Sequence, residues 1–208
     1  MTQCDITCYR RLMARWDPGA EERLKRAALE LFLERGYDNV TVTHIAERAG
    51  LTRRSYFRYF PDKREVLFGG SERLPPALAE AVLAADPDAA PLAAVLDALA
   101  RVGAELVELV EGAAERRAVI DATPELQERE RTKTAAITAA IRDALRRRQV
   151  DADRAELVAQ LATVAFQNAF RHWIEAEGRA SFGSCLDTVT DELRAALAGT
   201  GEGRPRSA

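Results

Sequence analysis

The chain has 208 residues, of which 47% are hydrophobic and 30% are charged, and its formal net charge is −3. This composition is sufficient for one large or two small globular domains with a hydrophobic core. The sequence contains neither an apolar run of the ~18 residues that span a bilayer nor the pattern of a signal peptide. We therefore expect a cytoplasmic protein that does not insert into a membrane.

Charge is unevenly distributed along the chain. Residues 10–64 contain 13 Lys and Arg against 8 Asp and Glu, so this segment is basic within a chain whose total charge is negative. A basic segment joined to an acidic one can approach phosphates, while the acidic part resists non-specific binding to nucleic acid. The asymmetry favours nucleic acid as a partner, although random scatter of surface charge would also produce it.

Catalytic and metal-binding patterns are missing from the sequence. Cys4, Cys8 and Cys185 form neither a CxxC pair nor a zinc-finger spacing with histidine partners. No GxSxG, HExxH or phosphate-binding glycine loop is present, and the two histidines, His44 and His172, fall in different predicted domains. We therefore predict a protein that is not an enzyme and that binds no metal and no cofactor.

The first predicted helix starts at Asp17-Pro18, where a capping carboxylate and a proline precede two acidic residues. It should end at Arg35-Gly36, because glycine terminates helices. Between these points the apolar residues recur at helical spacing and would form one buried face, made of Leu24, Ala27, Ala28, Leu31 and Phe32.

Two short helices are predicted next, separated by a glycine. Thr41 and Thr52 are candidate N-caps, and Gly50 between the two helices allows a sharp reversal. The residues predicted to face inward are Ile45, Ala46, Ala49, Tyr56 and Phe60. The second helix is rich in arginine, which suits bidentate contact with guanine edges and pairing with phosphate. Together the pattern predicts a helix-turn-helix.

A further helix is predicted to open after Pro61. Asp62 and Glu65 make a capping-box-like pair, and Lys63 together with the free N–H groups of the first turn makes a candidate phosphate seat.

The ordered matches are Ala27 through Phe32, Gly36-Tyr37, Thr41-Val42, Ile45-Ala46, Ala49 through Thr52, and Tyr56 through Lys63. This series resembles the N-terminal domain of TetR-type transcriptional regulators, over about a quarter of the chain. The resemblance implies that Thr41 and Thr43 contact phosphates, that Thr52 through Ser55 face the major groove, and that Lys63 clamps the DNA backbone.

Two positions depart from the family pattern. Arg54 stands where the family often has glycine, and Phe57 stands where it often has tyrosine, so the phenol contact to phosphate is lost. Arg58 or Tyr59 are candidates to replace that contact. His44 is either a phosphate ligand or a surface histidine without a role. The candidate DNA-contacting residues are Thr41, Thr43, His44, Thr52, Arg53, Arg54, Ser55, Phe57, Arg58, Tyr59 and Lys63.

Beyond Leu67 the sequence predicts five or six helices and no strand, which gives an all-α fold: an N-terminal three-helix domain followed by a helical bundle. A basic cluster, Arg146 through Arg148, suits a helix C-terminus better than DNA. The most informative helix runs from about Asp153 to Glu177, and it is apolar over so wide an arc that it must pack on more than one side.

By resemblance, this helix and the last one form a four-helix dimer interface with their copies in a second subunit. A two-fold pair of helix-turn-helix domains reads a palindromic operator in double-stranded DNA. The alternative is a monomer whose last helices pack only on each other. The candidate interface residues are Leu157, Leu161, Val164, Leu186, Val189 and Leu193.

The resemblance also implies a small-molecule pocket in the helical bundle. Phe166, Phe170 and Trp173 share one side of their helix, with Asn168 and His172 as candidate polar groups, which would suit a small apolar or aromatic effector. The alternative is that these aromatic residues are core. The predicted function is a dimeric repressor that an effector releases from its operator; the alternative is a DNA-binding regulator that acts constitutively or through a protein partner.

The predicted organisation has four parts. Residues 1–16 form a flexible arm in which Arg10, Arg11 and Arg15 either reach the DNA or stay solvated. Residues 17–66 form the DNA-binding domain, residues 67–198 the effector-binding and dimerisation domain, and residues 199–208 a disordered tail.

Overall fold

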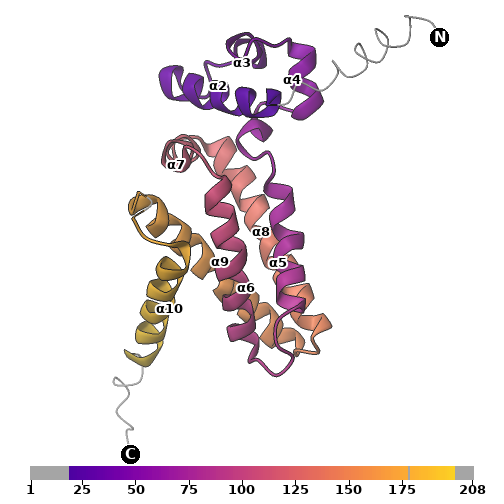
Figure 1. The fold of residues 1–208 in the computed structure, drawn as a ribbon, viewed down its shortest axis with the longest axis vertical. Coiled ribbons are helices and arrows are strands. Elements are labelled where there is room, and N and C mark those ends of the chain that lie inside the picture. Colours follow the sequence, from indigo (N-terminus) through magenta and orange to yellow (C-terminus); the bar gives the residue numbers. More distant parts are fainter. Residues whose placement is uncertain (1–18, 178, 200–208) are drawn as a thin grey trace, which may run out of the picture. The chain divides into compact units, whose positions relative to one another are not determined.

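The computed structural model describes residues 19–177 and 179–199. The predicted arm, the Asp17-Pro18 helix start, Cys4, Cys8 and the predicted tail beyond residue 199 lie outside this part. Within it, the chain forms nine α-helices, two short 3-10 helices and no strand, which confirms the all-α fold (Figure 1). None of the helices in residues 19–177 and 179–199 combines the length and the apolar character needed to cross a bilayer.

The chain folds into two compact units. The N-terminal unit comprises the described residues up to Gly69 together with Ala118–Glu125. The C-terminal unit comprises Gly70–Arg117 and the described residues from Leu126 onwards. A short segment from the middle of the sequence is therefore part of the N-terminal unit, a feature that local sequence patterns do not encode.

The N-terminal unit contains α2 (Ala20–Arg35), α3 (Val42–Arg48), α4 (Arg53–Tyr59) and the 3-10 helix η1 (Arg64–Leu67). As predicted, α2 ends at Arg35; Gly36 follows it with φ 77°, a conformation that L side chains rarely adopt. The apolar face predicted from the helical spacing is buried, and it consists of Leu24, Ala27, Ala28, Leu31 and Phe32, joined by Ala20.

The C-terminal unit is built mainly from six α-helices, in line with the five or six expected. They are α5 (Leu74–Leu83), α6 (Pro91–Leu109), α7 (Ala113–Asp121), α8 (Pro124–Arg147), α9 (Ala152–Glu175) and α10 (Phe182–Gly199), preceded by the 3-10 helix η2 (Ser71–Arg73). The ends of α7 and α8 nearest residues 121 to 124 belong to the N-terminal unit.

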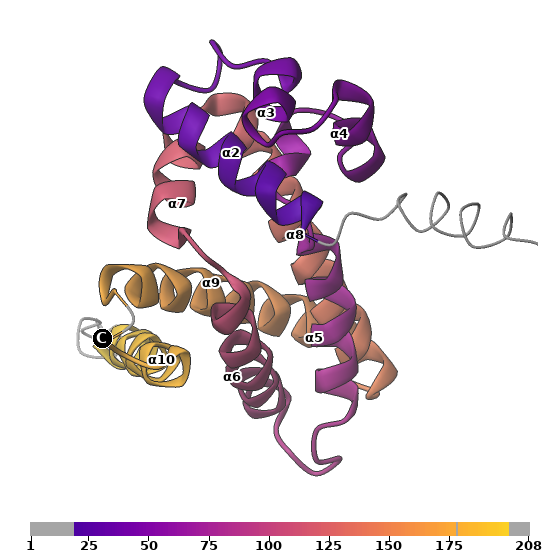
Figure 2. The same ribbon diagram turned by 45° about the horizontal axis from the view of Figure 1, so that its top comes forward.

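The core of the C-terminal unit joins these helices. α6 packs against α5, α9 and α10, and α9 packs along α10 (Figure 2). Arg148, just after α8, donates hydrogen bonds from its guanidinium to the carbonyl oxygens of Val82, Ala85 and Asp86 at 2.6–3.2 Å. The basic cluster was predicted to suit a helix C-terminus, and Arg148 does so, but the helix end that it caps is that of α5.

Candidate nucleic-acid interface

Both predicted threonine caps are present in the N-terminal unit. The Thr41 hydroxyl accepts a hydrogen bond from the backbone N–H of His44 at 3.2 Å, and the backbone N–H of Thr41 donates to His44 Nδ1 at 3.3 Å. The Thr52 hydroxyl accepts from the backbone N–H of Ser55 at 3.1 Å. These bonds satisfy N–H groups that a helix start leaves without partners, so they fix where α3 and α4 begin.

The capping role of His44 defines its tautomer. Because Nδ1 accepts the hydrogen bond from Thr41, the neutral imidazole carries its hydrogen on Nε2. Nε2–H is then a donor that can be offered to a phosphate oxygen. The structure thus assigns His44 a role in the fold that the sequence analysis did not foresee, alongside the candidate contact.

Two buried aromatic residues anchor α4. Tyr56 and Phe60, predicted to be core, are 0% and 2% exposed, and their ring centroids lie 5.4 Å apart. The Tyr56 hydroxyl donates to the carbonyl oxygen of Asp62 at 3.0 Å, and burial raises the pKa of this phenol. The buried side of α4 is therefore fixed, and its other side is presented to solvent.

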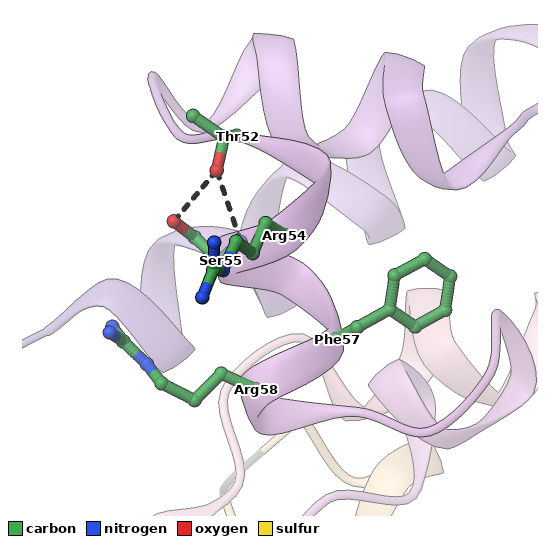
Figure 3. Close-up of a pocket in the computed structure, with 5 residues that line it drawn as sticks. All are labelled: Thr52, Arg54, Ser55, Phe57 and Arg58. Carbon is green, nitrogen blue, oxygen red and sulfur yellow. Dashed lines mark hydrogen bonds between the residues drawn. The ribbon is translucent and has the colours of Figure 1, made fainter.

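The solvent side of α4 carries the predicted reading residues. Arg53, Arg54 and Arg58 are exposed, and α4 contains no acidic residue. A concave surface of about 540 Å³ is lined by Thr52, Arg54, Ser55, Phe57 and Arg58 (Figure 3). In this view Phe57 and Arg58 project to different sides of the helix.

Two of these arginines lie against aromatic rings. The Arg53 guanidinium lies 5.4 Å from the centroid of Phe57, and that of Arg58 lies 5.0 Å from the centroid of Tyr59 and donates to its hydroxyl at 3.0 Å. Stacking on a ring restricts a guanidinium without neutralising its charge. Both arginines are therefore partly ordered while keeping their positive charge for a ligand.

Lys63 braces the N-terminal unit from within. Its ammonium donates to the carbonyl oxygens of Tyr37 and Val40 at 3.0 and 3.1 Å and lies 3.8 Å from the centroid of the Tyr37 ring. Burial lowers the pKa of Lys63, and the negative charges of Glu125 and Asp38 oppose this shift. These contacts hold the loop between α2 and α3; contact with a phosphate stays a prediction.

The helix predicted to open after Pro61 is present, and it is the short 3-10 helix η1. One carboxylate oxygen of Asp62 accepts from the backbone N–H groups of Arg64 and Glu65 at 2.8 and 3.2 Å. The other accepts from the Arg64 guanidinium at 2.8 Å. This guanidinium is the main reason that the pKa of Asp62 lies below its usual range.

Sequence reasoning missed the contacts that join distant segments of this unit. Arg48 on α3 forms ion pairs with Glu34 at 2.8 Å and Glu30 at 3.2 Å, both on α2. Arg64 lies 3.4 Å from Glu125, which belongs to the distant segment Ala118–Glu125. Spacings of this length carry no periodic signal, so only the folded structure identifies the partners.

In the C-terminal unit, the three candidate effector-site aromatics form a continuous row on α9. The ring of Phe166 lies 6.4 Å from that of Phe170 and 5.5 Å from that of Phe182, and the ring of Phe170 lies 5.5 Å from that of Trp173. Phe166 is buried in the hydrophobic core, and the other two are half-buried against it. The three residues share one side of α9, as predicted, and Phe166 belongs to the hydrophobic core.

Asn168 does not lie beside this aromatic row, contrary to expectation. An α-helix has 3.6 residues per turn, so Asn168 shares the face of Leu161 and Val164. Its amide donates to the carbonyl oxygen of Val164 at 2.8 Å and accepts from Arg171 at 2.6 Å. The error came from reading proximity in sequence as proximity around the helix. His172 is half-buried near the end of α9.

The candidate interface residues divide by burial. Leu157 and Val164 on α9 are 58% and 45% exposed, and Leu161 between them is half-buried. Leu186 and Val189 on α10 are buried within their own chain, and Leu193 packs against the same core. Among these candidates, Leu157 and Val164 on α9 therefore present the most apolar surface to solvent.

Comparison with known proteins bears on this architecture. Residues 24–68 match the family described as bacterial regulatory proteins of the tetR family. Over 45 residues the chain is 49% identical to the HTH-type transcriptional regulator TcmR of Streptomyces glaucescens, a match that spans 22% of this chain and 20% of that protein.

Solved structures extend the likeness to most of the chain. NalD, described as the secondary repressor of the MexAB-OprM multidrug efflux pump in Pseudomonas aeruginosa, has a TM-score of 0.58 at 16% identity, covering 86% of this chain and 96% of its own. The SmeT–triclosan complex has a TM-score of 0.54 at 18% identity, covering 84% of this chain and 91% of its own. At such identities the likeness establishes the fold.

These relatives are described as regulators rather than enzymes, in agreement with the sequence prediction. The family match covers the helix-turn-helix whose caps, buried anchors and arginine-rich face are described above. On this evidence residues 24–68 resemble the DNA-binding domain of bacterial regulatory proteins of the tetR family, and the described chain shares the fold of the solved structures named above.

Proposed function

We propose that the protein is a sequence-specific repressor that binds a palindromic operator as a homodimer and is released by a small apolar or aromatic effector. The observation that carries the proposal is the solvent face of α4, where Arg53, Arg54 and Arg58 are exposed on a helix held by buried aromatic residues. A rigid helix with several arginines and no carboxylate suits the major groove, where arginine pairs with guanine and phosphate.

The DNA-binding part is tested by selection from random duplex DNA with the full chain. One short sequence should be enriched, and Arg54→Ala should weaken binding to it about 5-fold or more, since a bidentate base contact contributes ~1–3 kcal/mol. Arg147→Ala is the matched control, because Arg147 is an exposed arginine of the C-terminal unit. Equal binding by Arg54→Ala and wild type would reject the assignment of the reading face.

Dimerisation is supported by the exposed apolar stripe on α9. Leu157, Leu161 and Val164 recur at i, i+4 and i+7, so they lie on one face of the helix, and Leu197 on α10 is 68% exposed. We propose that a second copy of the chain covers this stripe. A palindromic operator requires two copies of α4 about one DNA turn apart, ~34–36 Å, so that each reads one half-site.

Effector control is supported by the aromatic row and by the relatives. SmeT was solved with triclosan, and NalD is described as a repressor. Phe170 and Trp173 are half-buried beside the buried Phe166, so a modest shift of α9 would open an aromatic wall to a ligand. An effector that binds one arrangement of the two DNA-binding domains more tightly than the other would change operator affinity by that difference.

Triclosan is a practical first probe for the effector site. We expect it to quench or shift the fluorescence of Trp173 and to reduce operator affinity over the same concentration range, and Trp173→Phe should remove that part of the optical signal. Binding of the compound with unchanged operator affinity would contradict effector release.

The packing of Phe166 favours a second candidate function. This ring lies against Phe182 within the core, as it would in a C-terminal unit without a ligand cavity. A regulator that acts constitutively, or through a protein partner, would then bind its operator with an affinity that no small apolar compound changes. A screen of such compounds on the protein–operator complex distinguishes the two functions.

A further inference from the structure

Phe57 is an exposed aromatic side chain on the reading face of α4. Its side chain is 44% exposed, and among the described residues of the N-terminal unit only it and Leu33 are large, exposed and apolar. Loss of the hydroxyl relative to tyrosine removes any hydrogen bond to phosphate. An apolar ring with Arg53 against it, on a helix that also exposes Arg54 and Arg58, suits a partner that is apolar at one point and anionic elsewhere.

The ring is held in place on two sides. Phe57 packs edge-on against the buried Tyr56 at 5.6 Å with an interplanar angle of 82°, and the Arg53 guanidinium lies 5.4 Å from its centroid. Arg53 is one helical turn before Phe57, so the two side chains share a face of α4. The ring thus presents a fixed apolar surface beside a donor group.

Resting on the proposed function, we propose that Phe57 contacts the 5-methyl group of a thymine in the operator and selects for that base. In the major groove, the thymine methyl is an apolar feature that distinguishes the bases, and aromatic side chains contact it favourably. Arg53, Arg54 and Arg58 supply the positive charge that brings this surface to the phosphates on either side of the groove. Duplex DNA therefore fits the apolar and the charged parts of the surface together.

The test compares thymine with deoxyuridine, which differs from it only by the missing methyl group. After the operator has been selected with the full-length protein, each thymine is replaced singly by deoxyuridine and binding is measured by fluorescence anisotropy. For wild type, one position in each half-site should weaken binding about fourfold, the value of burying one methyl-sized group. Other thymine positions should be neutral.

Variants assign that loss to the ring. Phe57→Ala should bind the thymine and deoxyuridine operators equally, at about the affinity of wild type for deoxyuridine DNA, and Phe57→Leu should retain part of the discrimination. Leu33→Ala, which removes an exposed apolar side chain from α2, should discriminate as wild type does. Circular dichroism and thermal unfolding check that each variant is folded.

Two results would overturn the proposal: no deoxyuridine position that weakens wild-type binding, or a position whose penalty persists in Phe57→Ala. Both require a bound operator, so they differ from the failure of the proposed function, in which selection enriches no sequence. That last result would reject the regulator and the thymine contact together.

Discussion

Gly103 on α6 and Phe182 at the start of α10 approach so closely that a Cβ atom on Gly103 would lie 2.1 Å from the Phe182 ring. The ring is 1% exposed and also lies against Phe166 on α9, so it has no free space into which to move. The absence of a side chain at residue 103 therefore sets how closely α6, α9 and α10 pack in the C-terminal unit.

Gly103→Ala should lower the free energy of unfolding by about 1–3 kcal/mol, because the added methyl group overpacks the core. Gly183→Ala is the matched control: the new Cβ would lie 3.9 Å from the Ser181 hydroxyl oxygen, an ordinary contact, so helix propensity should leave stability unchanged or slightly raised. Urea unfolding followed by circular dichroism measures both. If Gly103→Ala is as stable as wild type, the helices do not pack this closely in solution. Adding Phe182→Leu to Gly103→Ala should restore part of the lost free energy of unfolding, because leucine is smaller than phenylalanine.

Arg148→Met should destabilise the protein by about 2 kcal/mol, since hydrogen bonds from a charged group to three backbone carbonyls are lost. Methionine keeps most of the apolar stem, so the change isolates the guanidinium. Thermal unfolding compares this variant with Arg147→Met, an exposed neighbour. Equal melting temperatures for the two variants would show that the contact with the end of α5 contributes nothing.

The pKa of Asp62 predicts an acid-sensitive contribution to stability. A carboxyl group whose folded-state pKa is depressed stabilises the fold above its unfolded pKa of about 3.9, and the contribution is lost as pH falls through the folded pKa. Asp62→Asn keeps a capping oxygen but not the charge, so it should be less stable than wild type at pH 7 and approach it below pH 4. Melting temperatures of both proteins, measured from pH 7 to pH 3, check this expectation. A constant difference between the two proteins over this range would contradict it. Asp187→Asn on α10 serves as the control.

The apolar stripe on α9 predicts the behaviour of a charged variant. Leu157→Glu combined with Val164→Glu should convert the proposed dimer into a monomer, because four carboxylates would be buried at a two-fold interface. Sedimentation velocity measures the state, and operator binding should weaken in parallel while the N-terminal unit stays folded. Leu109→Glu changes an exposed leucine on α6 and should remain dimeric. A wild-type monomer, or a dimer that survives both substitutions, would move the interface elsewhere.

Local patterns were sufficient to predict much of the N-terminal unit. Thr41 and Thr52 were identified as caps, and Tyr56 and Phe60 as core, because capping and helical spacing act over a few residues. The same patterns could not show that His44 completes the cap of α3, since histidine is not a usual residue at that position of a capping box.

Long-range partners could not be predicted in this way. Lys63 was predicted as a phosphate ligand from its neighbours in sequence, and those neighbours gave no sign of its bonds to the carbonyl oxygens of Tyr37 and Val40, more than 20 residues away. The basic cluster was likewise expected to suit the C-terminus of its own helix, but the acceptors of Arg148 lie at the end of α5 and just beyond it. Asn168 is close to Phe166 and Phe170 in sequence, but 3.6 residues per turn place it on the face of Leu161 and Val164, away from the aromatic row.

The most direct test of the central claim is fluorescence anisotropy of the full-length protein on duplex DNA from upstream of its own gene, at two salt concentrations, beside Arg54→Ala. We expect tight binding that weakens as salt rises, because phosphate contacts release counterions, and we expect Arg54→Ala to lose sequence preference. Sequence-specific binding by α4 would be contradicted if the protein bound this DNA no more tightly than random duplex and Arg54→Ala changed nothing. The same result on DNA selected from random sequence would exclude the explanation that the operator lies elsewhere.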